Sequence, residues 1–142
     1  MTTLYLLYSE HRYGGDIINP EDHWSSREDE HIEFNALGVV ASRDDADRFP
    51  EAFEVKEDVA VGDVVHVVIV RYGTGDTFGH TWGSWSLMGA STDEEKAQEL
   101  VDAINKDTYT GDEEAATGYS YAPWRGYFES LESCDLHTFV VK

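Results

Sequence analysis

The chain has 142 residues, with 29 acidic and 10 basic residues, a formal net charge of −19 and a single cysteine, Cys134. This length favours one domain over residues 1–142 with a core of its own, and one cysteine excludes an intramolecular disulfide framework or a cysteine-based zinc site. The negative charge repels nucleic acids and anionic lipids, so it argues against direct binding to either and favours a basic protein partner.

Residues 3–9 predict a first strand, and residues 10–31 form a long polar connection with Gly14-Gly15, Asn19-Pro20 and several acids. A connection of about twenty residues is unusual in a compact domain, so we expect it to be functional or mobile. Strand character resumes over residues 31–41.

Ser42 is a good N-cap for a short helical turn over residues 43–49, which Pro50 ends. Residues 52–55 then predict a short strand, followed by a turn. The run Val64–Val70 is the most strand-prone of the chain, because six of its seven residues are β-branched. Its lack of apolar–polar alternation predicts a central strand that is covered on both faces.

Three glycines within residues 73–79 predict a tight turn, after which residues 80–90 form a returning strand. Ser91, with Glu94 three residues later, matches a capping box at the start of a helix over residues 92–106. The helix has one apolar stripe, made of Ala97, Leu100, Val101 and Ile104. Its outer face is mostly acidic.

A second polar connection covers residues 107–121, and the chain ends in a strand over residues 134–141. These elements predict an α+β fold with a mainly antiparallel sheet of about six strands. In that fold, the long helix (92–106) packs on one face of the sheet, and a short helical turn covers residues 43–49.

The acids are concentrated in the connections and on the helix, and between Val64 and Thr92 only Asp76 is acidic. Trp24 stands alone in an acidic connection, where an exposed tryptophan would serve as an anchor for a partner protein. The predicted partner-binding residues are Trp24, Glu28, Asp29, Glu30, Asp112, Glu113 and Glu114.

The glycine turn is best explained as a hairpin turn, because it lacks the Gly-Lys-Ser/Thr ending of a phosphate-binding loop. The alternative is a ligand-binding or partner-binding loop that presents Asp76, Thr77, Phe78 and His80. Cys134 lies between acids, no Gly-x-Ser-x-Gly motif occurs, and the histidines have no metal-ligand spacing. We therefore expect no catalytic residues, no metal and no cofactor, and we do not expect an enzyme.

The Gly75-Asp76-Thr77-Phe78-Gly79 turn after a valine-rich strand, the helix at 92–106 and the segment Trp124–Leu131 resemble small uncharacterised accessory proteins of tailed bacteriophages. The resemblance covers residues 64–141. It implies a viral origin and a non-structural accessory role, with no known activity or catalytic residues to carry over.

Three functional hypotheses follow. The first is an acidic interaction protein that inhibits a host nucleic-acid-handling or defence system by imitating the phosphates of DNA. The second is a small protein adapted to high salt, and the third is a ligand-binding or enzymatic module that uses the loop Gly73–His80. No signal peptide or membrane-spanning run is evident, and a single cysteine is typical of a reducing compartment, so we expect a cytoplasmic protein, in the host cell if viral.

Overall fold

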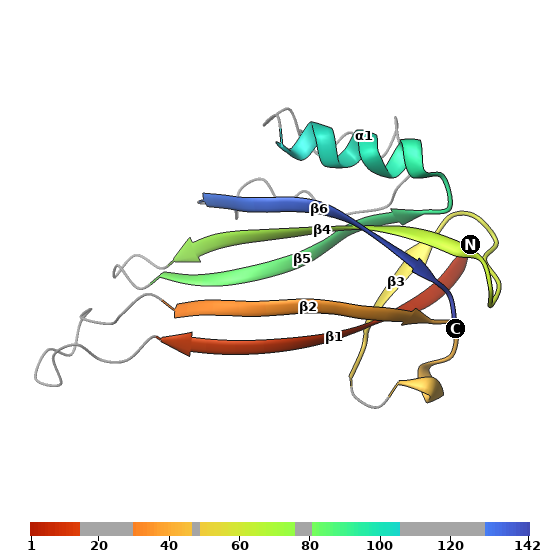
Figure 1. Ribbon diagram of the computed structural model, residues 1–142, viewed down its shortest axis with the longest axis horizontal. Coiled ribbons are helices and arrows are strands. Elements are labelled where there is room, and N and C mark those ends of the chain that lie inside the picture. Colours follow the sequence, from red (N-terminus) through yellow and green to blue (C-terminus); the bar gives the residue numbers. More distant parts are fainter. Residues whose placement is uncertain (15–29, 47–48, 76–80, 106–129) are drawn as a thin grey trace, which may run out of the picture.

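A computed structural model describes residues 1–14, 30–46, 49–75, 81–105 and 130–142 (Figure 1). The strands are β1 (Thr2–Gly14), β2 (Glu30–Val40), β3 (Glu51–Val55), β4 (Val64–Gly75), β5 (Thr81–Ser91) and β6 (Ser130–Val140). The helices are α1 (Glu94–Asn105) and the 3₁₀-helix η1 (Arg43–Asp45).

The strands form two three-stranded antiparallel sheets that are joined at one seam. Their order is β3-β1-β2-β5-β4-β6, so β1 is the middle strand of one sheet and β4 is the middle strand of the other. At the seam, β2 and β5 are parallel, and their register has a single pair, Glu30 with Trp82. The two sheets therefore share few backbone hydrogen bonds.

The predicted α+β class is wrong, because the protein is mainly β. Among the described residues, one 12-residue α-helix accompanies six strands. These strands divide into two three-stranded sheets joined by the single register pair of β2 and β5, instead of forming one sheet under a helix. The cause lies partly in β1, which continues five residues beyond the predicted end at Ser9. The residues of this extension are mostly polar, so their composition did not indicate a strand. Long strands allow the two sheets to pack face to face and to enclose a core between them.

The helices also differ in detail from the prediction. The short helical turn is a three-residue 3₁₀-helix that gives way to extended backbone at Ala46, and residues 47–48 lie outside the described part of the chain. Asp93, not Ser91, caps α1, because its Oδ1 accepts hydrogen bonds from the backbone N–H groups of Glu95 (3.0 Å) and Lys96 (3.5 Å). Ser91 is instead the buried last residue of β5.

The main core lies between the two sheets. Its fully buried side chains include Leu4 and Leu6 from β1, Phe34 from β2, and Val65 and Val67 from β4. The chain terminus closes this core at one end: the Lys142 N–H donates to the Val39 carbonyl (3.0 Å), and the Ala41 N–H donates to the Lys142 carbonyl (2.9 Å). Figure 1 shows both chain ends at this side of the molecule.

A second, smaller core lies under α1, on the outer face of the β5-β4-β6 sheet (Figure 1). The buried residues of the helix are the four of the predicted stripe, Ala97, Leu100, Val101 and Ile104. They pack against Val68, Val70 and Met88. Since Val65, Val67 and Ile69 face the other core, the prediction that this strand is covered on both faces is confirmed.

The ends of the strands opposite the chain termini carry polar side chains. Gly14 pairs with Glu30 at the end of the β1–β2 ladder, and Gly75 pairs with Thr81 at the end of the β4–β5 ladder. Figure 1 places both ladder ends at the same side of the molecule. Among the helices that the structure describes, none is long and apolar enough to cross a membrane.

Candidate functional site

Most of the predicted site residues lie outside the described part of the chain. This holds for Trp24, Glu28, Asp29, Asp112, Glu113 and Glu114, and for the loop residues Asp76, Thr77, Phe78 and His80. Their roles remain predictions. Glu30 is described: it is the first residue of β2, and its carboxylate lies 3.3 Å from Arg12 Nη1 with 26% of its side chain exposed. A basic residue of the protein itself thus already partners this acid.

The outer face of α1 carries a row of exposed carboxylates, Glu95, Glu99 and Asp102, which we call the acidic ridge. Their spacing of four and three residues places them on the face opposite the buried stripe. At a rise of about 1.5 Å per residue, neighbouring acids are separated by about 6 and about 4.5 Å along the helix axis. Gln98 Nε2 donates to Asp102 Oδ1 at 3.0 Å and holds that carboxylate in place.

The acidic ridge has an electrostatic cost. Like charges three or four residues apart destabilise a helix by about 0.2–0.5 kcal/mol per pair. Asp102 also lies near the C-terminus of α1, where the helix dipole favours cations, and the last turn of α1 contains no basic residue. Lys96, three residues before Glu99, offsets one of the two like-charge contacts of Glu99, so the net effect of the acidic ridge on the helix is still unfavourable.

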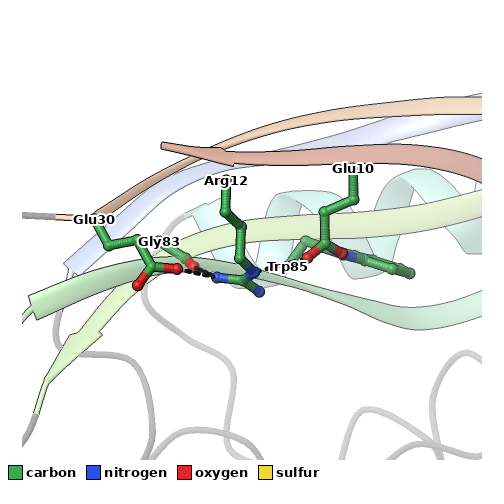
Figure 2. Close-up of polar contacts among 5 residues, drawn as sticks. All are labelled: Glu10, Arg12, Glu30, Gly83 and Trp85. Atoms are coloured by element: carbon green, nitrogen blue, oxygen red, sulfur yellow. Dashed lines mark hydrogen bonds and ion pairs between the residues drawn. The ribbon is translucent and has the colours of Figure 1, made fainter. Parts of the chain in front are cut away.

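A polar cluster centred on Arg12 lies at the end of the sheets opposite the chain termini. Arg12 Nε donates to Glu10 Oε1 at 2.8 Å, and Arg12 Nη1 donates to the Gly83 carbonyl at 2.9 Å and to Glu30 Oε1 at 3.3 Å. The second oxygen of Glu10 accepts a 2.8 Å hydrogen bond from Trp85 Nε1. Figure 2 shows the guanidinium group between the two carboxylates, with Gly83 and Trp85 contributed by β5.

Sequence reasoning missed this cluster because it ended the first strand at Ser9. The signal was present in the alternation of β1: Leu4, Leu6, Tyr8, Glu10 and Arg12 are spaced by two and so share one face of the strand. That face begins in the apolar core and continues into the charged cluster.

Aromatic side chains connect the core with the Arg12 cluster. Trp85 stacks on Phe34, with ring centroids 4.2 Å apart and an interplanar angle of 27°, and its ring centroid lies 4.8 Å from that of Tyr8. On the Phe34 ring, the Arg71 guanidinium carbon lies 5.7 Å from the centroid. Arg71 Nη2 also donates to the Phe34 carbonyl. Arg71 and Glu10 are thus held against these aromatic rings, Arg71 over Phe34 and Glu10 through its hydrogen bond with Trp85.

A cavity of about 450 Å³ opens beside these aromatic rings, lined by Tyr8, Glu10, Arg12 and Phe49. The Phe49 side chain is 85% exposed, which is unusual for a phenylalanine. Burial raises the pKa of Tyr8, and the nearby carboxylates of Glu10 and Glu51 raise it further. The hydroxyl of Tyr8 therefore stays protonated and lies in a negative electrostatic environment.

Two further titratable groups with shifted pKa values, Cys134 and His137, lie on β6. Burial and the neighbouring Asp135 raise the pKa of Cys134 to about 12, so its thiol is neutral and inert at physiological pH. Burial lowers the pKa of His137, with Asp135 opposing that shift and Arg71 adding to it. In the residues that the structure describes, no group of three or more histidine, cysteine or acidic side chains could hold a metal ion.

Two arrangements therefore stand out on the described surface: the acidic ridge on α1, and the cavity beside the Arg12 cluster. The first can attract cations over a distance, and the second combines an exposed aromatic ring with carboxylates. No protein family model, curated protein or solved structure matches the chain, so both are interpreted from their own geometry.

Proposed function

We propose that the protein is a non-enzymatic, acidic interaction protein that binds a basic partner through its carboxylate surface. The observation that carries this proposal is the acidic ridge, a row of exposed carboxylates on one helix face that weakens the helix instead of stabilising it. Charged residues that lower the stability of their own helix are typical of functional surfaces.

The overall composition supports the same proposal. Even if every lysine and arginine paired with one acid, 19 carboxylates would lack a basic residue of their own. A duplex carries one phosphate charge per about 1.7 Å of axis, or about 3.4 Å per strand. The axial spacing of the acidic ridge, about 4.5–6 Å, comes within a factor of two of the single-strand value.

The partner that suits such a surface is a basic, nucleic-acid-binding protein. In the setting implied by the resemblance to bacteriophage accessory proteins, this partner belongs to a host nucleic-acid-handling or defence system, which the protein inhibits from the host cytoplasm. The predicted contact residues Trp24, Glu28, Asp29 and 112–114 remain further candidates for contact with the same partner.

A second candidate function is adaptation to high salt, and one observation favours it. Exposed acids also occupy η1 (Asp44, Asp45) and β3 (Glu51, Glu54), on the side of the molecule away from α1 (Figure 1). A negative shell spread over opposite sides suits a protein that must stay soluble and folded in concentrated salt.

The test is a capture experiment from host lysate with the tagged protein, at low and high salt, read by mass spectrometry. The proposal predicts that a basic, nucleic-acid-binding protein is captured at low salt, released at high salt and displaced by duplex DNA. Salt adaptation predicts no specific capture and a fold that is lost at low salt. That second result would overturn the proposed function.

A further inference from the structure

The strand β1 has one edge that its neighbours cover only in part. On one side β2 pairs with it from Tyr5 to Gly14, whereas on the other side β3 pairs with it only from Thr2 to Leu6. From Leu7 to Gly14, the side away from β2 has no strand beside it among the described residues. We call this the free edge of β1.

The register indicates which backbone groups point toward the free edge. The backbone carbonyl of Val39 accepts a hydrogen bond from the Lys142 N–H (3.0 Å), so it points away from β1. Leu6, the register partner of Val39, therefore belongs to a non-hydrogen-bonded pair, and its N–H and C=O groups point away from β2. By alternation along β1, the same groups of Tyr8, Glu10 and Arg12 point to the free edge, while those of Ser9 and His11 point to β2.

The cavity of about 450 Å³ lies beside the free edge of β1. Tyr8, Glu10 and Arg12 line this cavity, and the exposed Phe49, two residues before β3, forms its remaining described wall. An edge strand next to a side-chain cavity is the arrangement by which proteins take up an extended peptide as an added strand. Backbone hydrogen bonds then provide affinity, and the cavity selects one side chain.

The charges beside the free edge select a basic segment. Arg12 is already engaged by Glu10 at 2.8 Å and Glu30 at 3.3 Å, so these three residues together carry a net negative charge. Glu51, the first residue of β3, pairs with Leu6 and adds a further carboxylate. A lysine or arginine would meet carboxylates and the aromatic ring of Tyr8, which favour cations. The Phe49 ring already binds a cation in this way, because the Arg43 guanidinium carbon lies 5.6 Å from its centroid.

We propose that the free edge of β1 accepts an extended basic segment of the partner protein as an added strand, with one lysine or arginine side chain in the cavity beside Phe49. The identity of the occupant rests on the proposed function, because the partner is taken to be basic. The site itself rests on the strand register and the cavity.

The experiment uses two fluorescent peptides of alternating lysine and threonine. One is unmodified, and the other is N-methylated at alternate residues, which keeps its charge but removes its strand-forming N–H groups. We expect the unmodified peptide to bind the full-length protein at low salt at least about tenfold more tightly than the methylated one, since several backbone hydrogen bonds are lost. In amide exchange, Tyr8, Glu10 and Arg12 should become protected on binding.

A matched pair of variants tests the cavity. Phe49→Ala should weaken binding of the unmodified peptide several-fold. Leu37→Ala removes an exposed hydrophobic side chain from β2, outside the cavity, and should leave binding unchanged. Loss of binding in both variants, or in neither, contradicts the role of the cavity.

The outcomes separate this inference from the proposed function. Equal binding of the two peptides without protection of the β1 amides overturns strand addition and leaves binding by charge intact. Failure of both peptides to bind at low salt contradicts both proposals. Slow exchange of the Tyr8, Glu10 and Arg12 amides in the free protein overturns the inference, because the edge would then already be covered by the chain itself or by a second copy.

Discussion

Arg12 Nη1 donates a 2.9 Å hydrogen bond to the carbonyl oxygen of Gly83, 71 positions away along the chain. The bond connects β1 with β5 across β2, at the seam where the two sheets share only the register pair of Glu30 and Trp82. Because Arg12 also binds Glu30 on β2, one side chain ties three strands together. The Arg12 cluster therefore holds the two sheets in position at the end that bears the cavity.

Replacing Arg12 should weaken this seam. Arg12→Met keeps the apolar stem but removes the hydrogen bond to Gly83 and leaves Glu10 and Glu30 without their shared cation, so we expect a loss of about 1–2 kcal/mol in the free energy of unfolding. Urea unfolding measures this loss, and faster amide exchange at Glu30 would locate it at the seam. Lys96→Met, on the exposed face of α1, is the control; an equal loss there would contradict the role assigned to Arg12.

Two glycines provide a matched test of packing at the seam. A Cβ atom on Gly83 would lie 2.9 Å from Ile32 Cγ2 and 3.4 Å from the Ile32 nitrogen, whereas one on Gly38 would meet nothing within 4 Å. Gly83→Ala should therefore cost about 1–3 kcal/mol through overpacking against a stiff β-branched side chain. Gly38→Ala should be neutral or slightly stabilising. Thermal unfolding distinguishes them, and similar midpoints for the two variants would show that the seam can relax.

Glu57 should give the stability a defined pH dependence. Its carboxylate accepts hydrogen bonds from Ser91 Oγ (2.7 Å) and Thr92 Oγ1 (3.3 Å), which tie the segment after β3 to the end of β5. Burial raises the pKa of Glu57, but these and backbone hydrogen bonds outweigh it, so the pKa lies below its ordinary value of 4.5. Since the folded-state pKa is lowered, Glu57 stabilises the fold above pH 4.5, and this contribution is lost as the pH falls through the folded pKa.

The measurement is urea unfolding of the native protein and Glu57→Gln across the acidic range. At neutral pH the variant should be less stable by about 0.5–1 kcal/mol, because solvent screens this largely exposed carboxylate, and the difference should shrink as the pH falls below about 4.5. Glu51 is the control of opposite sign, because burial raises its pKa. The stability of Glu51→Gln relative to the native protein should therefore be higher at neutral pH than at acidic pH. A Glu57→Gln deficit that does not change with pH would contradict the account.

The cost of the acidic ridge can be measured directly. Glu99 has Glu95 four residues before it and Asp102 three residues after it, but also Lys96 three residues before it. Glu99→Gln therefore removes two like-charge contacts and one favourable contact, and it should stabilise the protein by about 0.2–0.5 kcal/mol at low salt. The gain should vanish at high salt, where screening removes the repulsion. Glu94→Gln, in the first turn, should instead destabilise, because the helix dipole favours an acid there. A gain for Glu99→Gln that persists at high salt would exclude electrostatic repulsion as its cause.

Much of the secondary structure could be predicted from the sequence, because the β-branched run of β4 and the apolar stripe of α1 are strong local signals. The fold class was wrong because those signals do not specify how strands associate. The division into two sheets depends on the parallel seam at Glu30 and Trp82 and on contacts such as Arg12 with Gly83, which join residues far apart in the chain.

The candidate site shows the same contrast. The acidic outer face of α1 was visible from helical spacing alone. The Arg12 cluster was not, because Glu10 and Arg12 occur in a polar stretch that has the composition of a loop, although they continue the inward face of β1. The cavity beside Phe49 exists because the pairing of β3 with β1 extends only to Leu6, and no local sequence pattern predicts where that pairing ends.

The central claim is that the acidic ridge is a specific binding surface and not one part of a uniform negative shell. The most direct test compares two triple variants with the same change in net charge in the capture experiment from host lysate. One carries Glu95→Lys, Glu99→Lys and Asp102→Lys in the acidic ridge; the other carries Glu33→Lys, Asp44→Lys and Glu54→Lys, at exposed positions on β2, η1 and β3. The account predicts that the ridge variant loses the basic partner at low salt while the control variant retains it. Equal retention or equal loss in the two variants would contradict it.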